Sequence, residues 1–276
     1  MSQVQISASL VKELRDRTGA GMMAAKRALE ETGGDVDAAQ KLLREQGMAA
    51  AGKKAGRETT EGEVLATVSG SLGAIVAIGC ETEPVSKNDE FLGFAEAVLE
   101  AVEENGPDAV EALEERRLEL IGRLGENVEL RGAARMEAGD GELLAEYVHP
   151  PANKIGVLVR MKGGDEVFAR RLAMHISFAA PRFRTADEIP AEELEAERAI
   201  YAQQPDVVDK PEEVRAKIVE GRLRKEFLAA AALAEQAWIH DCSASAAAAR
   251  NSLRRRPSTI FARTSSGLSC TSGCCS

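Results

Sequence analysis

The chain has 276 residues, of which 44% are hydrophobic and 29% charged, so it holds enough apolar material for two modest domains with cores of their own. Its formal net charge of -10 argues against a dedicated nucleic-acid-binding protein, because phosphate contacts require a basic surface. Aromatic residues make up only 4%, so the aromatic walls of a deep enzyme pocket are not expected.

The N-terminal residues, the apolar runs and the cysteines of the chain favour a cytoplasmic location. The first residues contain neither a basic stretch nor an apolar run, so no secretory signal is predicted. No segment approaches the roughly 18 consecutive apolar residues of a membrane span, so no membrane partner is expected. Cys80 is the one cysteine of the first 241 residues, as is usual in a reducing compartment.

The N-terminal part is predicted to form three short helices and a basic linker. Ser7 or Ser9 can cap the first helix, and a second runs over Met22–Glu31. Asp35 can cap a third helix, which we expect to end at Gly47. Three helices of this length form a small bundle.

The order strand, strand, helix then occurs twice. The first set has apolar, partly β-branched strands over 64–68 and 74–78, followed by a helix from Asp89. The second set has strands over 143–148 and 155–161, again followed by a helix. The sequence therefore predicts an α+β protein with a duplicated strand-strand-helix core.

Two features follow the second set. Pro190 and Pro211 each lie at the first turn of an amphipathic helix, which predicts an antiparallel helical hairpin inserted at about 190–227. From Cys242 the composition changes: the last 35 residues contain nine serines, five arginines and no acidic residue. Without an apolar period, this tail is predicted to be disordered.

The expected domains follow from these elements. They are a three-helix domain and linker over 1–54, a first core subdomain over 55–140, a second core subdomain with the hairpin over 141–241, and the divergent tail over 242–276.

No catalytic site is expected. Gly19-Ala20-Gly21 starts a formal dinucleotide fingerprint, but a helix precedes it where that motif needs a strand. Lys54 stands where a phosphate-binding loop needs a Ser or Thr. The three histidines lack metal-ligand spacing. We therefore predict a protein that is not an enzyme and has no cofactor, metal or small-molecule substrate.

Several blocks, in order, resemble one known family over about residues 3–241. They are Leu14–Met23, Asp35–Gly47, Cys80–Val85, Leu124–Asn127, Tyr147–His149, Ile155–Val159, Ala173–Ile176 and Val219–Arg222. Together they resemble the elongation factor Ts family. The resemblance implies a ubiquitin-associated-like N-terminal domain, a duplicated core, a coiled-coil insertion and binding to elongation factor Tu with release of its GDP and Mg²⁺.

The resemblance also implies the partner-binding residues. A segment that disturbs the partner's Mg²⁺ site corresponds to Thr82, Glu83, Pro84 and Val85. Further contacts correspond to Arg15, Met22, Met23, Leu124, Gly125 and His149. Of the two methionines, we expect one in the core and the other exposed as an adaptable contact.

Two departures from the family stand out. Pro84 occupies a position that is usually Phe, so a wedge built on a large ring is replaced by a rigid, smaller one. The tail lacks the family's final helix and apolar strand, as a changed reading frame or a foreign C-terminal sequence would explain. The alternative function is a ubiquitin-associated-like module that binds ribosomes or nascent chains, although this would explain only the first fifty or so residues.

Overall fold

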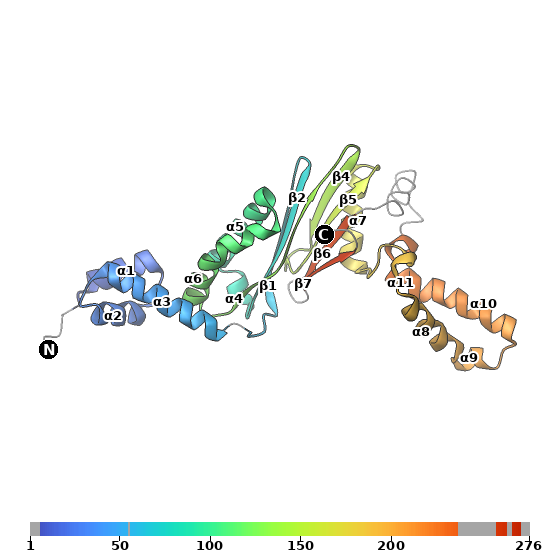
Figure 1. Ribbon diagram of the computed structural model, residues 1–276, viewed down its shortest axis with the longest axis horizontal. Helices are drawn as coiled ribbons and strands as arrows, with labels where there is room; N and C mark the ends of the chain where they lie inside the picture. The colour runs from blue at the N-terminus through green and yellow to red at the C-terminus, as the bar shows by residue number, and fades with distance from the viewer. Residues whose placement is uncertain (1–5, 55, 237–257, 264–266, 272–276) are drawn as a thin grey trace.

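The computed structural model describes residues 6–54, 56–236, 258–263 and 267–271 (Figure 1). These residues form an N-terminal helical bundle, two antiparallel sheets flanked by helices, and a projecting helical arm. The predicted α+β class is confirmed. Among the described residues, no helix combines the length and the apolar character needed to cross a membrane.

The N-terminal bundle consists of α1 (Ala8–Thr18), α2 (Met22–Glu31) and α3 (Val36–Lys54). Ser7 caps α1 by accepting the Leu10 amide at 3.3 Å. The Asp35 carboxylate caps α3 by accepting the amides of Asp37 and Ala38, each at 3.0 Å. The bundle interior holds small and aliphatic side chains: Leu14, Ala25, Ala28, Leu29 and Ala39.

Helix α3 is longer than predicted. It continues through Gly47 and ends at Lys54, so the residues expected in a basic linker form its last turn. The cause is a tertiary contact, because α3 packs against α6 (Glu114–Leu124) and Gly47 lies directly against Gly122. A glycine ends a helix only where nothing else stabilises its continuation.

The first sheet has the order β1-β2-β3, and all its strands are antiparallel. Its strands are β1 (Glu61–Ser69), β2 (Leu72–Cys80) and β3 (Val128–Glu137). The sequence pattern did not predict β3. The second sheet has the order β4-β5-β6-β7, with β4 (Glu142–Val148), β5 (Ile155–Lys162), β6 (Ser258–Arg263) and β7 (Gly267–Thr271).

The tail prediction is wrong for two segments. Residues 242–276 were expected to be disordered, yet β6 pairs with β5 from Ile155↔Arg263 to Arg160↔Ser258, and β7 pairs with β6. An unpaired edge on β5 would leave backbone groups without partners, and a short β-prone run satisfies them despite its lack of a longer apolar period. The rest of the tail lies outside the described residues.

The two sheets pack face to face between layers of helices (Figure 1). Helices α5 (Asp89–Asn105) and α6 cover the outer face of the first sheet, and α7 (Glu166–Ala179) covers that of the second. The inner faces meet in an apolar core of Val64, Ile75, Ala77, Met136 and Leu158. Short 3-10 turns lie at Pro107–Leu113, Ala186–Glu188 and Leu233–Glu235.

Gly156 lets the two sheets approach closely, and this gives a first prediction. A Cβ atom on Gly156 would lie 2.4 Å from Val64 Cγ1 and 3.3 Å from Ile75 Cδ1. We expect Gly156→Ala to lower the free energy of unfolding by about 1–3 kcal/mol, the usual cost of overpacking. Urea unfolding measures the change. Gly93→Ala, with open space around it in α5, should instead stabilise by up to about 1 kcal/mol.

The helical arm contains the hairpin predicted at about 190–227. Its elements are α8 (Ala191–Ala202), α9 (Pro205–Val208), α10 (Glu212–Arg222), a π-helical turn (Leu223–Leu228) and α11 (Ala229–Ala231). Tyr201, Val207, Val219 and Leu223 form its narrow core. Figure 1 shows the arm projecting away from the sheets.

Candidate partner-binding site

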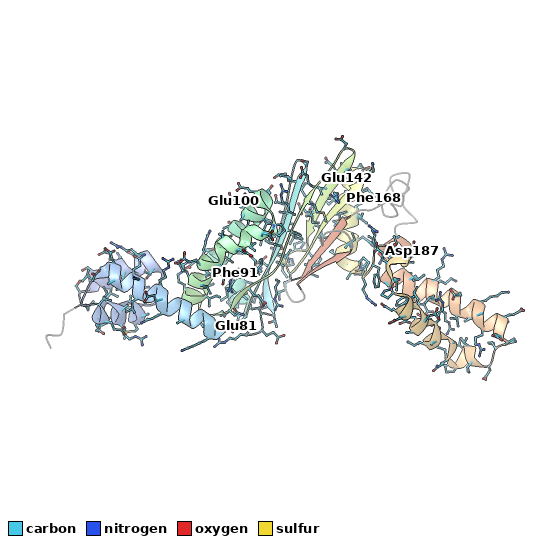
Figure 2. The ribbon with its side chains drawn as sticks, in the orientation of Figure 1. Glu81, Phe91, Glu100, Glu142, Phe168 and Asp187 are labelled. Atoms are coloured by element: carbon cyan, nitrogen blue, oxygen red, sulfur yellow. The ribbon has the colours of Figure 1, made fainter. Side chains whose placement is uncertain are left out.

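The segment that follows β2 presents three exposed residues at one end of the first sheet. Thr82, Glu83 and Pro84 are exposed, whereas the Val85 side chain packs against the core beneath α5. Pro84 lies in the first turn of the short helix α4 (Glu83–Ser86), where proline is well tolerated. Figure 2 shows Glu81, just before this segment, at the opposite end of the sheets from Glu142.

Glu126 holds the beginning of this segment. One of its carboxylate oxygens accepts the Thr82 amide at 3.0 Å, and the other accepts the Thr82 hydroxyl at 2.7 Å. Glu126 follows Gly125, which ends α6 in the left-handed conformation at φ 80°. The Asn127 amide donates to Glu81 at 2.6 Å. Two residue pairs, Thr82–Glu126 and Glu81–Asn127, therefore link the chain after β2 to the chain after α6. Hydrogen bonds to a charged acceptor are the stronger kind.

A second carboxylate holds the end of the segment. The ammonium group of Lys87 pairs with Glu63, whose side chain in β1 is almost fully buried. The Ser86 hydroxyl donates to the Glu83 carbonyl at 2.8 Å. Thr82–Lys87 is therefore fixed at both ends, and its exposed residues are presented on a rigid base.

Cys80, the last residue of β2, is part of this support. It is fully buried, and its thiol donates to the Thr82 carbonyl at 3.3 Å. Burial, with smaller contributions from Glu126 and Glu61, raises the pKa of the thiol from 9.0 to about 12. The thiol therefore stays protonated and is not a nucleophile at neutral pH.

This raised pKa leads to a second prediction. We expect Cys80 in the folded chain to react with iodoacetamide at pH 8 at least about 1000-fold more slowly than after unfolding in urea, since each unit of pKa is tenfold in thiolate. Peptide mapping by mass spectrometry reads Cys80 separately from the cysteines of the tail. Equal rates in the two states would mean that the thiol is accessible and ionised.

The N-terminal bundle lies beside the same end of the first sheet. Arg123 of α6 pairs with Glu90 in the first turn of α5 at 2.8 Å. A Cβ atom on Gly19, in the left-handed turn between α1 and α2, would lie 2.9 Å from Arg123 Cδ. The α1–α2 turn therefore rests on a side chain that also contacts α5.

The other predicted bundle residues flank this turn. The Arg15 Nε atom donates to the Ala20 carbonyl at 3.3 Å and so restrains the turn. Met22 and Met23 are 60% and 63% exposed, so the expectation that one of them lies in the core is wrong. Both begin α2, which buries Ala25, Ala28 and Leu29 instead.

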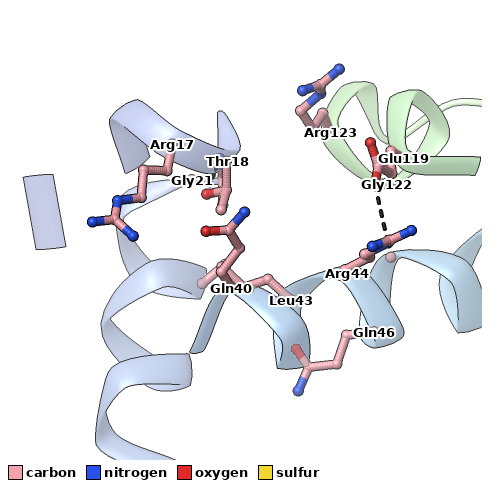
Figure 3. Close-up of a pocket in the computed structure, with 13 residues that line it drawn as sticks. Arg17, Thr18, Gly21, Gln40, Leu43, Arg44, Gln46, Glu119, Gly122 and Arg123 are labelled. Atoms are coloured by element: carbon pink, nitrogen blue, oxygen red, sulfur yellow. Dashed lines mark hydrogen bonds and ion pairs between the residues drawn. The ribbon is translucent and has the colours of Figure 1, made fainter. Parts of the chain in front are cut away.

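A cavity of about 330 Å³ lies between the bundle and α6, beside the contact of Gly47 with Gly122 (Figure 3). Thr18, Gly21 and Gln40 line it from the bundle, and Gly122 and Arg123 line it from α6. An ion pair of Arg44 with Glu119, at 3.2 Å, bridges the two sides. The lining of this cavity mixes polar and apolar side chains, and the residues that line it include no buried pair of catalytic groups. Within the described part of the chain, no three His, Cys, Asp or Glu side chains are grouped to hold a metal ion.

His149 lies on the β4–β5 turn of the second sheet. It is exposed, and its Nδ1 atom is 3.0 Å from the Tyr147 hydroxyl. The Val64 amide donates to Asn153 of this turn at 2.7 Å, and Lys154 pairs with Glu61, the register partner of Cys80. His149 therefore shares one end of the molecule with Thr82.

The structure thus brings most of the predicted residues together at one end. Thr82 and Gly125 are joined through Glu126, and the bundle reaches them through Arg123 and Glu90. The sequence did not single out Glu126, although it lies in a block that was noted. Nothing local could have revealed the Lys87–Glu63 pair, because it depends on how β1 lies beside the chain after β2.

The fold and the site define an α+β protein whose exposed loops and side chains suit contact with another macromolecule. Comparison with known proteins identifies the family to which the chain belongs. A family model described as Elongation factor TS matches residues 81–261. Similar proteins named Elongation factor Ts occur in Alkalilimnicola ehrlichii (43% identity over 248 residues, covering 86% of this chain and 84% of the relative) and Arthrospira platensis (42% over 249 residues, 86% and 99%).

A further relative of the same name, from Haemophilus influenzae strain PittGG, is 42% identical over 245 residues, covering 87% of this chain and 84% of the relative. The chain therefore belongs to the elongation factor Ts family and is a translation elongation factor. The resemblance drawn from the sequence blocks is confirmed.

Proposed function

We propose that this chain is a guanine-nucleotide exchange factor that binds elongation factor Tu and promotes release of its GDP and Mg²⁺. The observation that supports this best is the exposed segment Thr82–Pro84, held at one end by Glu126 and at the other by Glu63. An exchange factor must stabilise the nucleotide-free form of its partner, and a rigid segment loses little entropy when it does so.

The mechanism requires no chemistry from this chain, so it is not an enzyme. Pro84 offers a rigid apolar wedge in place of a larger ring, and Glu83 brings a carboxylate toward a site that holds phosphate and Mg²⁺. A negative charge beside the phosphates would weaken GDP binding, and one beside the metal would compete for it. By reciprocity, GDP weakens binding of the exchange factor by the same factor.

The remaining proposed contacts with elongation factor Tu use residues near the same end of the molecule. Arg15, Met22 and Met23 of the bundle, with Leu124 and Gly125 beside Glu126, would bind the GTPase domain, and His149 would bind another domain of the partner. Exposed methionines suit such a contact because they adapt to irregular apolar surfaces. The activity belongs in the cytoplasm and involves neither nucleic acid nor membrane directly.

We also propose the domain organisation that this function uses. Residues 1–54 would be a ubiquitin-associated-like domain, and 55–140 and 141–241 two copies of one α+β unit with the arm inserted in the second. The same order of elements in both units supports the duplication: each starts with an antiparallel hairpin and continues with a helix. A later strand then joins each sheet, β3 beside β2 within the first unit and β6, which follows residue 241, beside β5 of the second.

The test is release of a fluorescent GDP analogue from elongation factor Tu, with and without this chain at micromolar concentration. Strong acceleration is the expected result. Binding without acceleration would mean that the Pro84 wedge does not act on the nucleotide site. Cosedimentation with ribosomes in the absence of any binding to elongation factor Tu would favour a ribosome or nascent-chain module instead.

A further inference from the structure

Three stretches of the chain meet at Glu81: the linker after α3, the turn after β2 and the turn after α6. One oxygen of the Glu81 carboxylate accepts the Asn127 amide at 2.6 Å and lies 3.5 Å from the Arg57 guanidinium. The Asn127 side chain donates to the Arg57 carbonyl at 2.9 Å. Each of these three residues therefore contacts the other two, and we call the set the linker triangle. Figure 2 shows Glu81 where α3 meets the first sheet.

Asn127 is the buried corner of the linker triangle. Only 4% of its surface is exposed, so its polar groups depend on partners within the protein. Its backbone amide donates to Glu81 and its side-chain amide donates to Arg57. Because the acceptor in Glu81 is a carboxylate, the bond to Glu81 is the stronger of the two. Asn127 therefore holds the turn after β2 and the linker at the same point.

The linker joins this triangle to the N-terminal bundle. The Arg57 amide donates at 3.0 Å to the carbonyl of Lys54, the last residue of α3. Two residues further on, Thr59 is fully buried, and the guanidinium of Arg131 in β3 donates to its carbonyl at 2.7 Å. Arg57 is thus held between α3 and β3. A linker restrained in this way transmits the position of α3, as a flexible linker would not.

We propose that Glu81 is a positioning residue for nucleotide exchange, which couples the N-terminal bundle to the exposed segment Thr82–Pro84. This inference rests on the proposed function. Thr82 follows Glu81 directly, so the residue that holds the linker is also the one from which the segment starts. Two contact surfaces at a fixed spacing bind one partner more tightly than two that move independently, because the second contact becomes intramolecular. Glu81 therefore acts on the affinity for the partner.

The role of Glu81 differs from that of Glu126. Glu126 holds Thr82 itself, and the pair of Lys87 with Glu63 holds the other end of the segment. Neither contact involves Glu81, which instead fixes the segment relative to the linker and the bundle. Loss of Glu81 should therefore weaken binding but leave the segment able to act on a partner that is bound.

Release of a fluorescent GDP analogue from elongation factor Tu, measured over a range of concentrations of the full chain, tests this role. The measurement yields a maximal release rate and a half-saturating concentration. We expect Glu81→Ala to raise the half-saturating concentration at least about fivefold and to keep the maximal rate within about twofold. Glu81→Gln keeps an acceptor for the Asn127 amide and loses only a partly exposed ion pair, so its half-saturating concentration should stay within about twofold of the unchanged chain.

A double-mutant cycle distinguishes this coupling from a general structural effect. Met23→Ala truncates an exposed side chain of the bundle and should raise the half-saturating concentration of the unchanged chain at least about threefold. In the Glu81→Ala background, the same change should raise it less than about 1.5-fold, because the bundle then contributes less to binding. Glu58→Ala removes an exposed carboxylate from the same linker and should change neither quantity.

Asn127→Ala opens the linker triangle from its other side. The backbone amide can still donate to Glu81, but the donor to the Arg57 carbonyl is lost. The half-saturating concentration should therefore rise while the maximal rate is kept. Urea unfolding of each variant checks stability, and the Glu81 variants decide the question by themselves if Asn127→Ala does not fold.

Three results would overturn this inference while the proposed function stands. The first is acceleration by Glu81→Ala with an unchanged half-saturating concentration. The second is an equal effect of Met23→Ala in both backgrounds, which would mean that the bundle and the segment bind independently. The third is a fall in the maximal rate alone, which would mean that Glu81 supports only the segment. Failure of the unchanged chain to accelerate release would instead refute the proposed function, and this inference with it.

Discussion

Replacing Glu126 with alanine should reduce the proposed acceleration of GDP release from elongation factor Tu by about 10–100-fold while the chain stays folded. The carboxylate accepts both the amide and the hydroxyl of Thr82, and so holds the start of that segment from the α6 side. Hydrogen bonds to a charged group contribute about 1.5–3 kcal/mol, and about 1.4 kcal/mol is tenfold in rate or affinity.

Stability should change much less than exchange. Thr82 is exposed, so water can replace both lost hydrogen bonds in the free protein. The cost appears when the partner binds, because the segment must then be ordered without its support. We expect urea unfolding to shift by less than about 1 kcal/mol.

Two further variants make the Glu126 result specific. Glu126→Gln keeps one acceptor oxygen and should give intermediate exchange. Glu100→Ala removes an exposed carboxylate from α5, away from the segment, and should behave as the unchanged chain does (Figure 2). Normal exchange by Glu126→Ala would show that Thr82 needs no support. A matching loss of stability and exchange would point to unfolding instead.

Local signals in the sequence predicted most of the helices and four of the strands. Ser7 and Asp35 cap their helices as expected, and the prolines at 190 and 211 precede α8 and α10. These signals succeed because a cap or a proline acts within a few residues of its own position.

Elements that depend on distant partners were missed. The strand β3 has no clear alternation of apolar and polar residues, and its pairing with β2 also contains a bulge at Ala77/Ile78. β6 forms on the edge of β5, about a hundred residues earlier in the chain. The extension of α3 past Gly47 likewise depends on α6. Strand propensity is decided largely by such neighbours, so sequence alone cannot assign it.

Much of the candidate site likewise depends on contacts between residues that are far apart in the chain. Thr82–Val85 was found through family resemblance, and no local pattern marks it as a contact. Glu126 binds Thr82 across 44 positions of the chain, and Lys87 pairs with Glu63 across 24. Exposure of both Met22 and Met23 also required the structure, because helical spacing shows which residues share a face but not which face the bundle buries.

The bundle can act together with Thr82–Val85 only if it is held in place, and Gly122 makes that possible. A Cβ atom on Gly122 would lie 3.0 Å from Gly47 Cα, so α3 and α6 cross backbone to backbone. This close crossing brings Arg44 to Glu119 at 3.2 Å and sets the α1–α2 turn against Arg123. Backbone atoms cannot swing aside as a long side chain can.

Gly122→Val should therefore push α3 away from α6 and lower the acceleration of GDP release at least about tenfold, as expected when one of two linked contact surfaces loses its position. The core should remain intact, because Gly122 is exposed on the side of α6 that faces the bundle. Hydrogen exchange should rise in α3 and along the facing side of α6, while β1–β3 remain protected.

The matched control is Gly93→Val, which makes the same change in α5 where no atom beyond the adjoining turns of the helix lies within 4 Å of the added Cβ. Gly93→Val should leave both the acceleration of GDP release and the hydrogen-exchange protection unchanged. This control therefore distinguishes the effect of valine on helix propensity from the effect of forcing α3 away from α6. If Gly122→Val exchanged GDP normally while α3 lost protection, the bundle would not need its position. In that case Thr82–Val85 and the β4–β5 turn would suffice, and the bundle would serve only to tether the partner.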